Sequence, residues 1–87
     1  MPRFDAEVVV MPKPEVADPQ GQAIEGALAR LGLTGEVQAR HIHVGKVFRL
    51  DLEASDRAAA EQALHTLADR VLANPNIETF QLKVSSH

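Results

Sequence analysis

The 87-residue sequence has no cysteine, no tryptophan and no tyrosine, and only three phenylalanines. The absence of cysteine excludes a disulfide framework and a thiol nucleophile, and it is typical of proteins from a reducing compartment. Basic clusters are also absent, because the nine Lys and Arg residues are scattered and the formal net charge is −3. Since nucleic-acid binding needs a concentrated basic face, we do not expect a nucleic acid as a partner.

Long apolar runs are missing as well. The longest, Val8-Val9-Val10-Met11, is far too short to cross a bilayer, and acidic residues interrupt the apolar core that a signal peptide would need. We therefore expect a cytoplasmic protein without membrane contact. The length predicts one domain over residues 1–87, with a core so small that an oligomer is expected.

The apolar pattern predicts the first strand and the first helix. Strict alternation of apolar residues predicts a strand over residues 4–11. Prolines keep residues 12–19 extended, and Asp18-Pro19 predicts a helix start with the carboxylate as the cap. An apolar stripe continues this helix to Gly32, which we expect to end it in the left-handed conformation. The stripe consists of Ile24, Ala27, Leu28 and Leu31.

A hairpin is predicted after the first helix. Two strands, over residues 36–44 and 47–53, flank Gly45-Lys46, a two-residue turn in which glycine would supply a positive φ. In this register the basic residue Arg40 faces the acidic residue Asp51, which supports the pairing.

The remainder of the chain predicts a second helix and a last strand. Ser55 is expected to cap a helix over residues 56–73, Asn74-Pro75 ends it, and alternation predicts a strand over residues 77–84. The buried seam of this helix would consist of Ala60, Leu64, Leu67 and Val71. The order of elements predicts an α+β, ferredoxin-like (βαββαβ) fold, with two helices on one face of a four-stranded, mostly antiparallel sheet.

The residue types argue against a self-contained enzyme. No glycine-rich phosphate loop is present, and the serines lie at a helix cap or near residue 86. His41 and His43 would share one side of a strand and could hold a metal, but no third ligand lies at a fixed spacing. Gly21 at a helix N-terminus could help to hold an anion, although close backbone packing is the commoner reason for such a glycine. We therefore predict no catalytic, cofactor-binding or metal-binding residue.

The sheet face opposite the helices predicts an interface between two copies of the chain. In the predicted topology this face is apolar at one end and polar at the other, which is typical of a contact surface. The candidates for this dimer interface are Val9, Met11, Ile42, Val44 and Val47.

Three segments resemble the PurS family, the small subunits of phosphoribosylformylglycinamidine (FGAM) synthase. Lys13-Pro14-Glu15-Val16-Ala17-Asp18-Pro19-Gln20-Gly21 is similar to the family signature, in which Asp-Pro-Gln-Gly opens a helix. Val44-Gly45-Lys46 and Leu72-Ala73-Asn74-Pro75-Asn76-Ile77-Glu78 are also similar, in the same order and spacing. The chain departs from the family pattern at His43, where members commonly carry Arg.

The resemblance implies a non-catalytic accessory subunit of an enzyme of de novo purine (IMP) biosynthesis. That enzyme uses ATP, Mg²⁺ and glutamine, and its chemistry belongs to a PurL-type synthetase subunit and a PurQ-type glutaminase subunit. PurS-type subunits are implied to bridge these two and to support ammonia transfer, while binding no cofactor themselves. The resemblance also implies a homodimer, or a larger even oligomer, whose subunits exchange segments.

We expect the three segments to meet at one end of the domain, because binding usually resides on loops that a rigid sheet positions. The partner-interface candidates are Lys13, Asp18, Pro19, Gln20, Gly21, His43, Gly45, Lys46, Asn74 and Pro75. The alternative is a ligand-sensing regulatory module of the ACT type, which has a similar order of strands and helices. Such a module favours a glycine-rich loop after the first strand, where this chain has Pro12-Lys13-Pro14.

Overall fold

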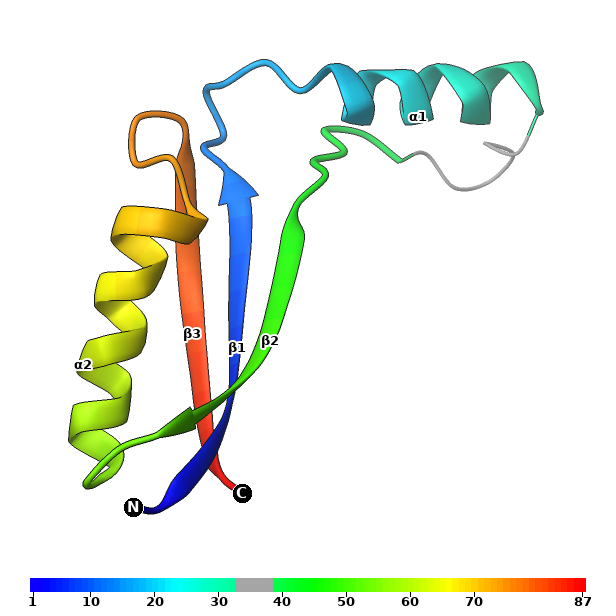
Figure 1. The fold of residues 1–87 in the computed structure, drawn as a ribbon. Helices are drawn as coiled ribbons and strands as arrows, with labels where there is room; N and C mark the ends of the chain where they lie inside the picture. Colours follow the sequence, from blue (N-terminus) through cyan, green and yellow to red (C-terminus); the bar gives the residue numbers. More distant parts are fainter. Residues whose placement is uncertain (33–38) are drawn as a thin grey trace.

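The structure, a computed structural model, describes residues 1–32 and 39–87 and shows a three-stranded antiparallel sheet with two α-helices (Figure 1). The elements follow in the order β1 (Arg3–Pro12), α1 (Pro19–Arg30), β2 (Lys46–Glu53), α2 (Arg57–Leu67), the π-helical turn η1 (Ala68–Leu72) and β3 (Glu78–Ser86). The strand order is β2-β1-β3, so β1 lies in the centre with an antiparallel neighbour on each side. The predicted α+β class is confirmed.

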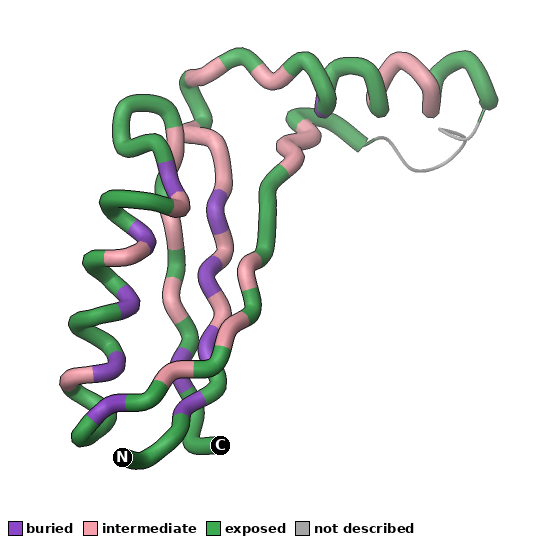
Figure 2. Tube along the Cα trace, in the orientation of Figure 1, coloured by how far each residue is buried: buried purple, intermediate pink, exposed green. Residues whose placement is uncertain are grey.

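The core lies between the sheet and α2. On β1 the alternation holds as predicted, and every second residue is buried: Phe4, Ala6, Val8 and Val10. Helix α2 contributes Ala60 and Leu64, and β3 contributes Val84, so the buried positions follow β1, α2 and β3 (Figure 2). Within the described residues no helix is both long and apolar enough to cross a membrane.

The second helix differs from the prediction at both of its ends. Its cap is Asp56 rather than Ser55, because the Asp56 carboxylate accepts the N–H of Ala59 at 2.8 Å. At the other end the α-helix is followed by the wider π-helical turn η1. There the N–H of Ala73 donates to the C=O of Ala68, five residues back, at 2.9 Å. The wider turn rotates the following residues, so Val71, predicted to be buried, is 70% exposed.

The predicted hairpin is wrong. Residues 39–44 form no strand, residues 36–38 lie outside the described part, and Gly45 has no positive φ. Strand β2 instead pairs with β1, which places Asp51 opposite Asp5 rather than opposite Arg40. The strand predicted over residues 47–53 is confirmed as β2, but periodicity shows which face a strand buries and not which strand lies beside it.

The first helix projects away from the sheet, so the prediction of two helices on one face is wrong for this chain taken alone (Figure 1). The molecule measures 53 × 27 × 14 Å and has a radius of gyration of 17.1 Å, whereas a compact domain of this length is expected near about 12 Å. Gly32 ends the helix with a φ of 67°, as predicted. The described residues leave the apolar stripe of α1 partly uncovered: Ile24 is 43% exposed and Leu31 is 69% exposed.

The face of the sheet that α2 covers is covered unevenly. Helix α2 packs against β3 and β1. The side chains that β2 directs to the same side, Phe48, Leu50 and Leu52, are only partly buried. An apolar strip therefore lies beside α2, on the sheet face that the sequence predicts to carry two helices.

Candidate functional site

Asp18 joins the start of α1 to the segment that precedes β2. Its Oδ1 accepts the N–H of Gly21 at 2.9 Å, and its Oδ2 accepts the N–H of Val44 at 2.8 Å. The carboxylate is thus a helix cap, as predicted, and also a link across 26 residues of sequence. The N–H groups of Gly21 and Val44, with His43 nearby, hold the pKa of the Asp18 carboxyl below its ordinary value of 3.8.

His43 lies beside this carboxylate. Its Nδ1 is 3.8 Å from Oδ2 of Asp18, and no hydrogen-bond partner of this buried atom is present among the described residues. His41, two residues earlier, has a φ of 55°, and its N–H donates to Oε1 of Glu25 on α1 at 3.0 Å. Since neither histidine lies in a strand, the expectation that both would point to one side of a strand is wrong.

Gly21 and Gly45 allow two backbone segments to approach closely. A Cβ at Gly21 would lie 1.7 Å from the carbonyl oxygen of Ile42. A Cβ at Gly45 would lie 2.5 Å from the carbonyl oxygen of Val10 and 2.1 Å from Sδ of Met11. Both positions therefore need glycine for lack of space, which fits the close-packing explanation for Gly21.

Glu78 at the start of β3 links Lys46 to the Asn74-Pro75 turn. Its Oε1 accepts the N–H of Asn74 at 2.7 Å, and its Oε2 lies 3.9 Å from Nζ of Lys46. The N–H groups of Ile77 and Glu78 donate to the C=O of Asn74 at 3.1 and 2.7 Å. The turn is thus held by its backbone, and the carboxylate connects it to the segment before β2.

Lys13 completes the connection, because its N–H donates to the C=O of Ile77 at 2.8 Å. Residues 13–21, 41–46 and 74–78 lie together at the end of the sheet that is opposite both termini (Figure 1), and we call this region the loop end. The expected meeting of the three segments at one end is confirmed. Their role in partner binding stays a prediction. The exposed candidates are Pro19, Gln20, Gly45, Lys46, Asn74 and Pro75.

A groove of about 310 Å³ lies at the loop end, between the start of α1 and residues 41–43. Three carboxylates line it, those of Glu15, Asp18 and Glu25, together with the two histidines. Asp18 and Glu25 already accept backbone N–H groups. The groove is therefore acidic, and two of its carboxylates, Asp18 and Glu25, hold the loop end together.

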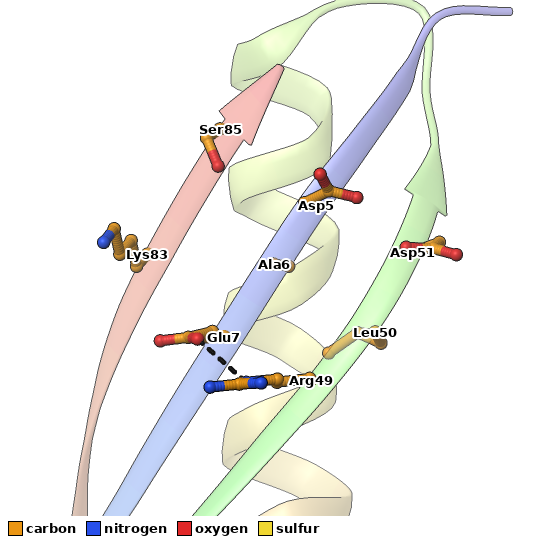
Figure 3. A pocket seen from close by; sticks show the side chains of 8 residues that line it. All are labelled: Asp5, Ala6, Glu7, Arg49, Leu50, Asp51, Lys83 and Ser85. Atoms are coloured by element: carbon orange, nitrogen blue, oxygen red, sulfur yellow. Dashed lines mark hydrogen bonds and ion pairs between the residues drawn. The ribbon is translucent and has the colours of Figure 1, made fainter. Parts of the chain in front are cut away.

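A larger hollow of about 410 Å³ lies on the sheet face opposite α2, which we call the open face (Figure 3). Its lining comes from all three strands: Asp5, Ala6, Glu7, Arg49, Leu50, Asp51, Lys83 and Ser85. Across β1 and β2, Nε of Arg49 donates to Oε1 of Glu7 at 3.1 Å. The hollow is lined by charges of both signs, and it lies away from the loop end.

Asp5, Asp51 and His87 on the open face could each offer one ligand atom to a metal ion, all within 4.8 Å of one another. All three residues are exposed. His87 Nδ1 lies 2.9 Å from Oδ1 of Asp5 and lowers the pKa of that carboxyl, and Nη2 of Arg3 lies 3.8 Å from Oδ2 of Asp51. The two carboxylates thus already have neighbouring groups of the same chain, His87 and Arg3.

The structure separates the five dimer-interface candidates. Val9, Met11 and Val47 belong to strands, and their positions alternate with the buried residues, which places them on the open face. Ile42 and Val44 lie in the irregular segment before β2, against the start of α1. The predicted patch is therefore divided between two regions.

Two residues that connect the loop end were missed by sequence reasoning. The carboxylate of Glu25 accepts the N–H of His41, 16 residues further along the chain, and no sequence spacing predicts such a contact. Glu78 lies four residues after Asn74, and a carboxylate at that distance from an Asn-Pro turn is a local signal that could have identified it.

Comparisons with known proteins agree with the family resemblance. The family model described as PurS, phosphoribosylformylglycinamidine (FGAM) synthase, matches residues 5–86. The PurS subunit of FGAM synthase from Synechocystis is 37% identical over 83 residues, which cover 95% of this chain and 80% of that protein.

Solved structures show the same fold. Thermus thermophilus PurS has a TM-score of 0.81 and 31% identity, covering 99% of both chains. A chain in the structure of PurLQS from Thermotoga maritima has a TM-score of 0.84 and 25% identity, covering 98% of this chain and all of that one. These similarities do not support the ACT-type alternative. The chain belongs to the PurS family, the small accessory subunits of FGAM synthase, a ligase of purine biosynthesis.

Proposed function

We propose that this chain bridges a PurL-type synthetase subunit and a PurQ-type glutaminase subunit and supports the transfer of ammonia between them. The observation that carries this proposal is the loop end, where the three family-like segments join through Asp18, Glu78 and two close-packed glycines. The Thermotoga maritima relative, seen in a PurLQS structure, supports the choice of partners.

The chemistry of the complex is assigned to the partners in this proposal. ATP and Mg²⁺ would act at the synthetase subunit and glutamine at the glutaminase subunit, while this chain contributes surface and geometry. A cytoplasmic location is part of the proposal, because the reaction needs ATP and glutamine.

The proposed partner surface is the exposed part of the loop end. It combines the first turn of α1, whose N–H groups carry partial positive charge, with the ammonium group of Lys46, which is 61% exposed. Such a surface suits carbonyl-rich or anionic partner groups.

Reconstitution tests the bridging role. The purified chain is mixed with the cognate synthetase and glutaminase subunits, and the elution of a complex and its glutamine-dependent activity are measured. We expect all three proteins to elute together, and Lys46→Glu to weaken the complex. If no complex forms under any nucleotide condition, the bridging role is wrong.

We also propose a dimer in which the α1 helices are exchanged. The exposed stripe of α1 would lie on the partly buried strip formed by Phe48, Leu50 and Leu52 in a second copy, beside that copy's α2. This arrangement would place two helices on one face of each sheet, as the order of elements predicts, through the exchange of segments that the resemblance implies. Its support is the radius of gyration of 17.1 Å, together with the two uncovered apolar surfaces.

The open face offers a second possible dimer interface, through Val9, Met11 and Val47. Two substitutions distinguish the interfaces when oligomeric state is measured by sedimentation: Ile24→Glu on α1 and Val47→Lys on the open face. We expect Ile24→Glu to yield monomers and Val47→Lys to leave the dimer intact. The opposite pattern would assign the interface to the open face and refute the exchange of helices.

A further inference from the structure

Glu78 is the last residue of the third family-like segment, and the sequence predicts no role for it. Its side chain is 18% exposed, while that of its partner Lys46 is 61% exposed. One carboxylate oxygen is fixed by the N–H of Asn74 at 2.7 Å, which leaves the other oxygen facing Nζ of Lys46 at 3.9 Å. The fixed member of this ion pair is therefore the acid, and the lysine is the member that reaches solvent.

We propose that Glu78 is a positioning residue for partner binding, which holds the ammonium group of Lys46 in the orientation that the partner subunit meets. This inference rests on the proposed function, because it takes the loop end as the partner surface. The partner group that fits is a carboxylate or a cluster of carbonyl oxygens, which an ammonium group binds.

The ion pair between Lys46 and Glu78 should contribute little to the stability of the fold. An ion pair whose lysine is mostly exposed is screened by water and salt, and it adds little to stability. An unrestrained lysine, however, loses its rotamer freedom when it binds, which weakens association. A restraint present before binding removes part of that loss, so Glu78 affects binding more than it affects folding.

The test is a double-mutant cycle with Glu78→Gln and Lys46→Met. Glutamine keeps a carbonyl oxygen for the N–H of Asn74 and removes only the charge that faces Lys46. Binding of each variant to the cognate PurL-type and PurQ-type subunits is measured in two salt concentrations, with thermal unfolding of the isolated chain as the second readout. We expect Glu78→Gln to weaken binding about two- to fivefold without lowering the unfolding temperature.

The double variant should bind no more weakly than Lys46→Met alone, because Glu78 acts through Lys46. The matched control is Glu61→Gln, which removes the acid from another exposed pair, with Arg57 on α2 at 3.0 Å, and should leave binding unchanged. If Lys46→Met binds normally, the loop end around Lys46 is not the partner surface and the proposal fails with it. If Lys46→Met weakens binding and Glu78→Gln does not, only the positioning role is wrong.

Discussion

At the scale of single residues, two glycines of α1 differ in the space around them, so replacing each with alanine should change stability in opposite directions. Gly21→Ala places a Cβ 1.7 Å from the carbonyl oxygen of Ile42, so the backbone has to shift, and we expect a loss of about 1–3 kcal/mol. Gly26→Ala is the matched control, because within the described part of the chain its Cβ would meet just Nη1 of Arg30, at 3.5 Å. It should stabilise the chain by up to about 1 kcal/mol, through helix propensity. Urea unfolding of both variants measures the difference, and equal effects would contradict the close approach.

A second prediction at this scale concerns pH and Asp18. Its folded pKa lies below the ordinary value of 3.8, so the stability it adds is complete at neutral pH and disappears as the pH falls through the folded pKa. Asp18→Asn keeps one acceptor oxygen and cannot serve the N–H groups of both Gly21 and Val44. We expect this variant to unfold at a lower temperature at pH 7 and to show a smaller change between pH 5 and pH 2. A parallel acid dependence of variant and wild type would show that Asp18 is not responsible.

At the scale of elements, the π-helical turn η1 determines which residues are buried after α2 ends at residue 67. Leu64 is fully buried and Val71 is 70% exposed, although both fit one helical stripe in the sequence. Leu64→Ala should therefore cost about 2–5 kcal/mol, whereas Val71→Ala should change stability by less than about 0.5 kcal/mol. Denaturant unfolding of the two variants checks this directly. A large loss at Val71 would mean that this side chain is covered, by a second subunit or by a regular α-helix.

The elements also show where sequence reasoning succeeds and where it cannot. The alternation on β1 and β3 and the caps at Asp18 and Gly32 are local signals, and the structure confirms them. The partner of β2 is a long-range choice. The Arg40–Asp51 match is wrong, because Asp51 lies opposite Asp5 on β1 and its carboxylate lies 3.8 Å from Nη2 of Arg3. The prediction that residues 12–19 are extended is wrong, because the N–H of Val16 donates to the C=O of Lys13 at 3.0 Å and forms a turn. The position of α1 depends on how this segment leaves the sheet, which apolar periodicity does not record. At the loop end, the motifs predicted which segments meet, and the linking carboxylate of Glu78 lay outside the predicted set.

At the scale of the whole molecule, the exposed stripe of α1 makes stability dependent on concentration. If two copies cover each other's apolar surfaces, folding is coupled to association, and tenfold dilution should lower the unfolding free energy by about 1.4 kcal/mol per dimer. Thermal unfolding at several protein concentrations measures this effect, with small-angle scattering as the check on size. An unfolding temperature that is independent of concentration, together with a monomer in solution, would refute the exchanged dimer.

The central place of β1 also has a consequence for the order in which the protein can fold. Phe4 lies opposite Leu52 on one side and opposite Ser86 on the other, so neither neighbour of the central strand is close in sequence. Such pairings require large loops to close before any contact is gained, and they fold slowly. On the ribosome, β1 is synthesised first and keeps an unpaired edge until residues 78–86 have emerged. The nascent chain therefore carries a strand that contains Val8, Val9 and Val10 and has at least one unpaired edge until β3 emerges, which is the period when aggregation competes with folding.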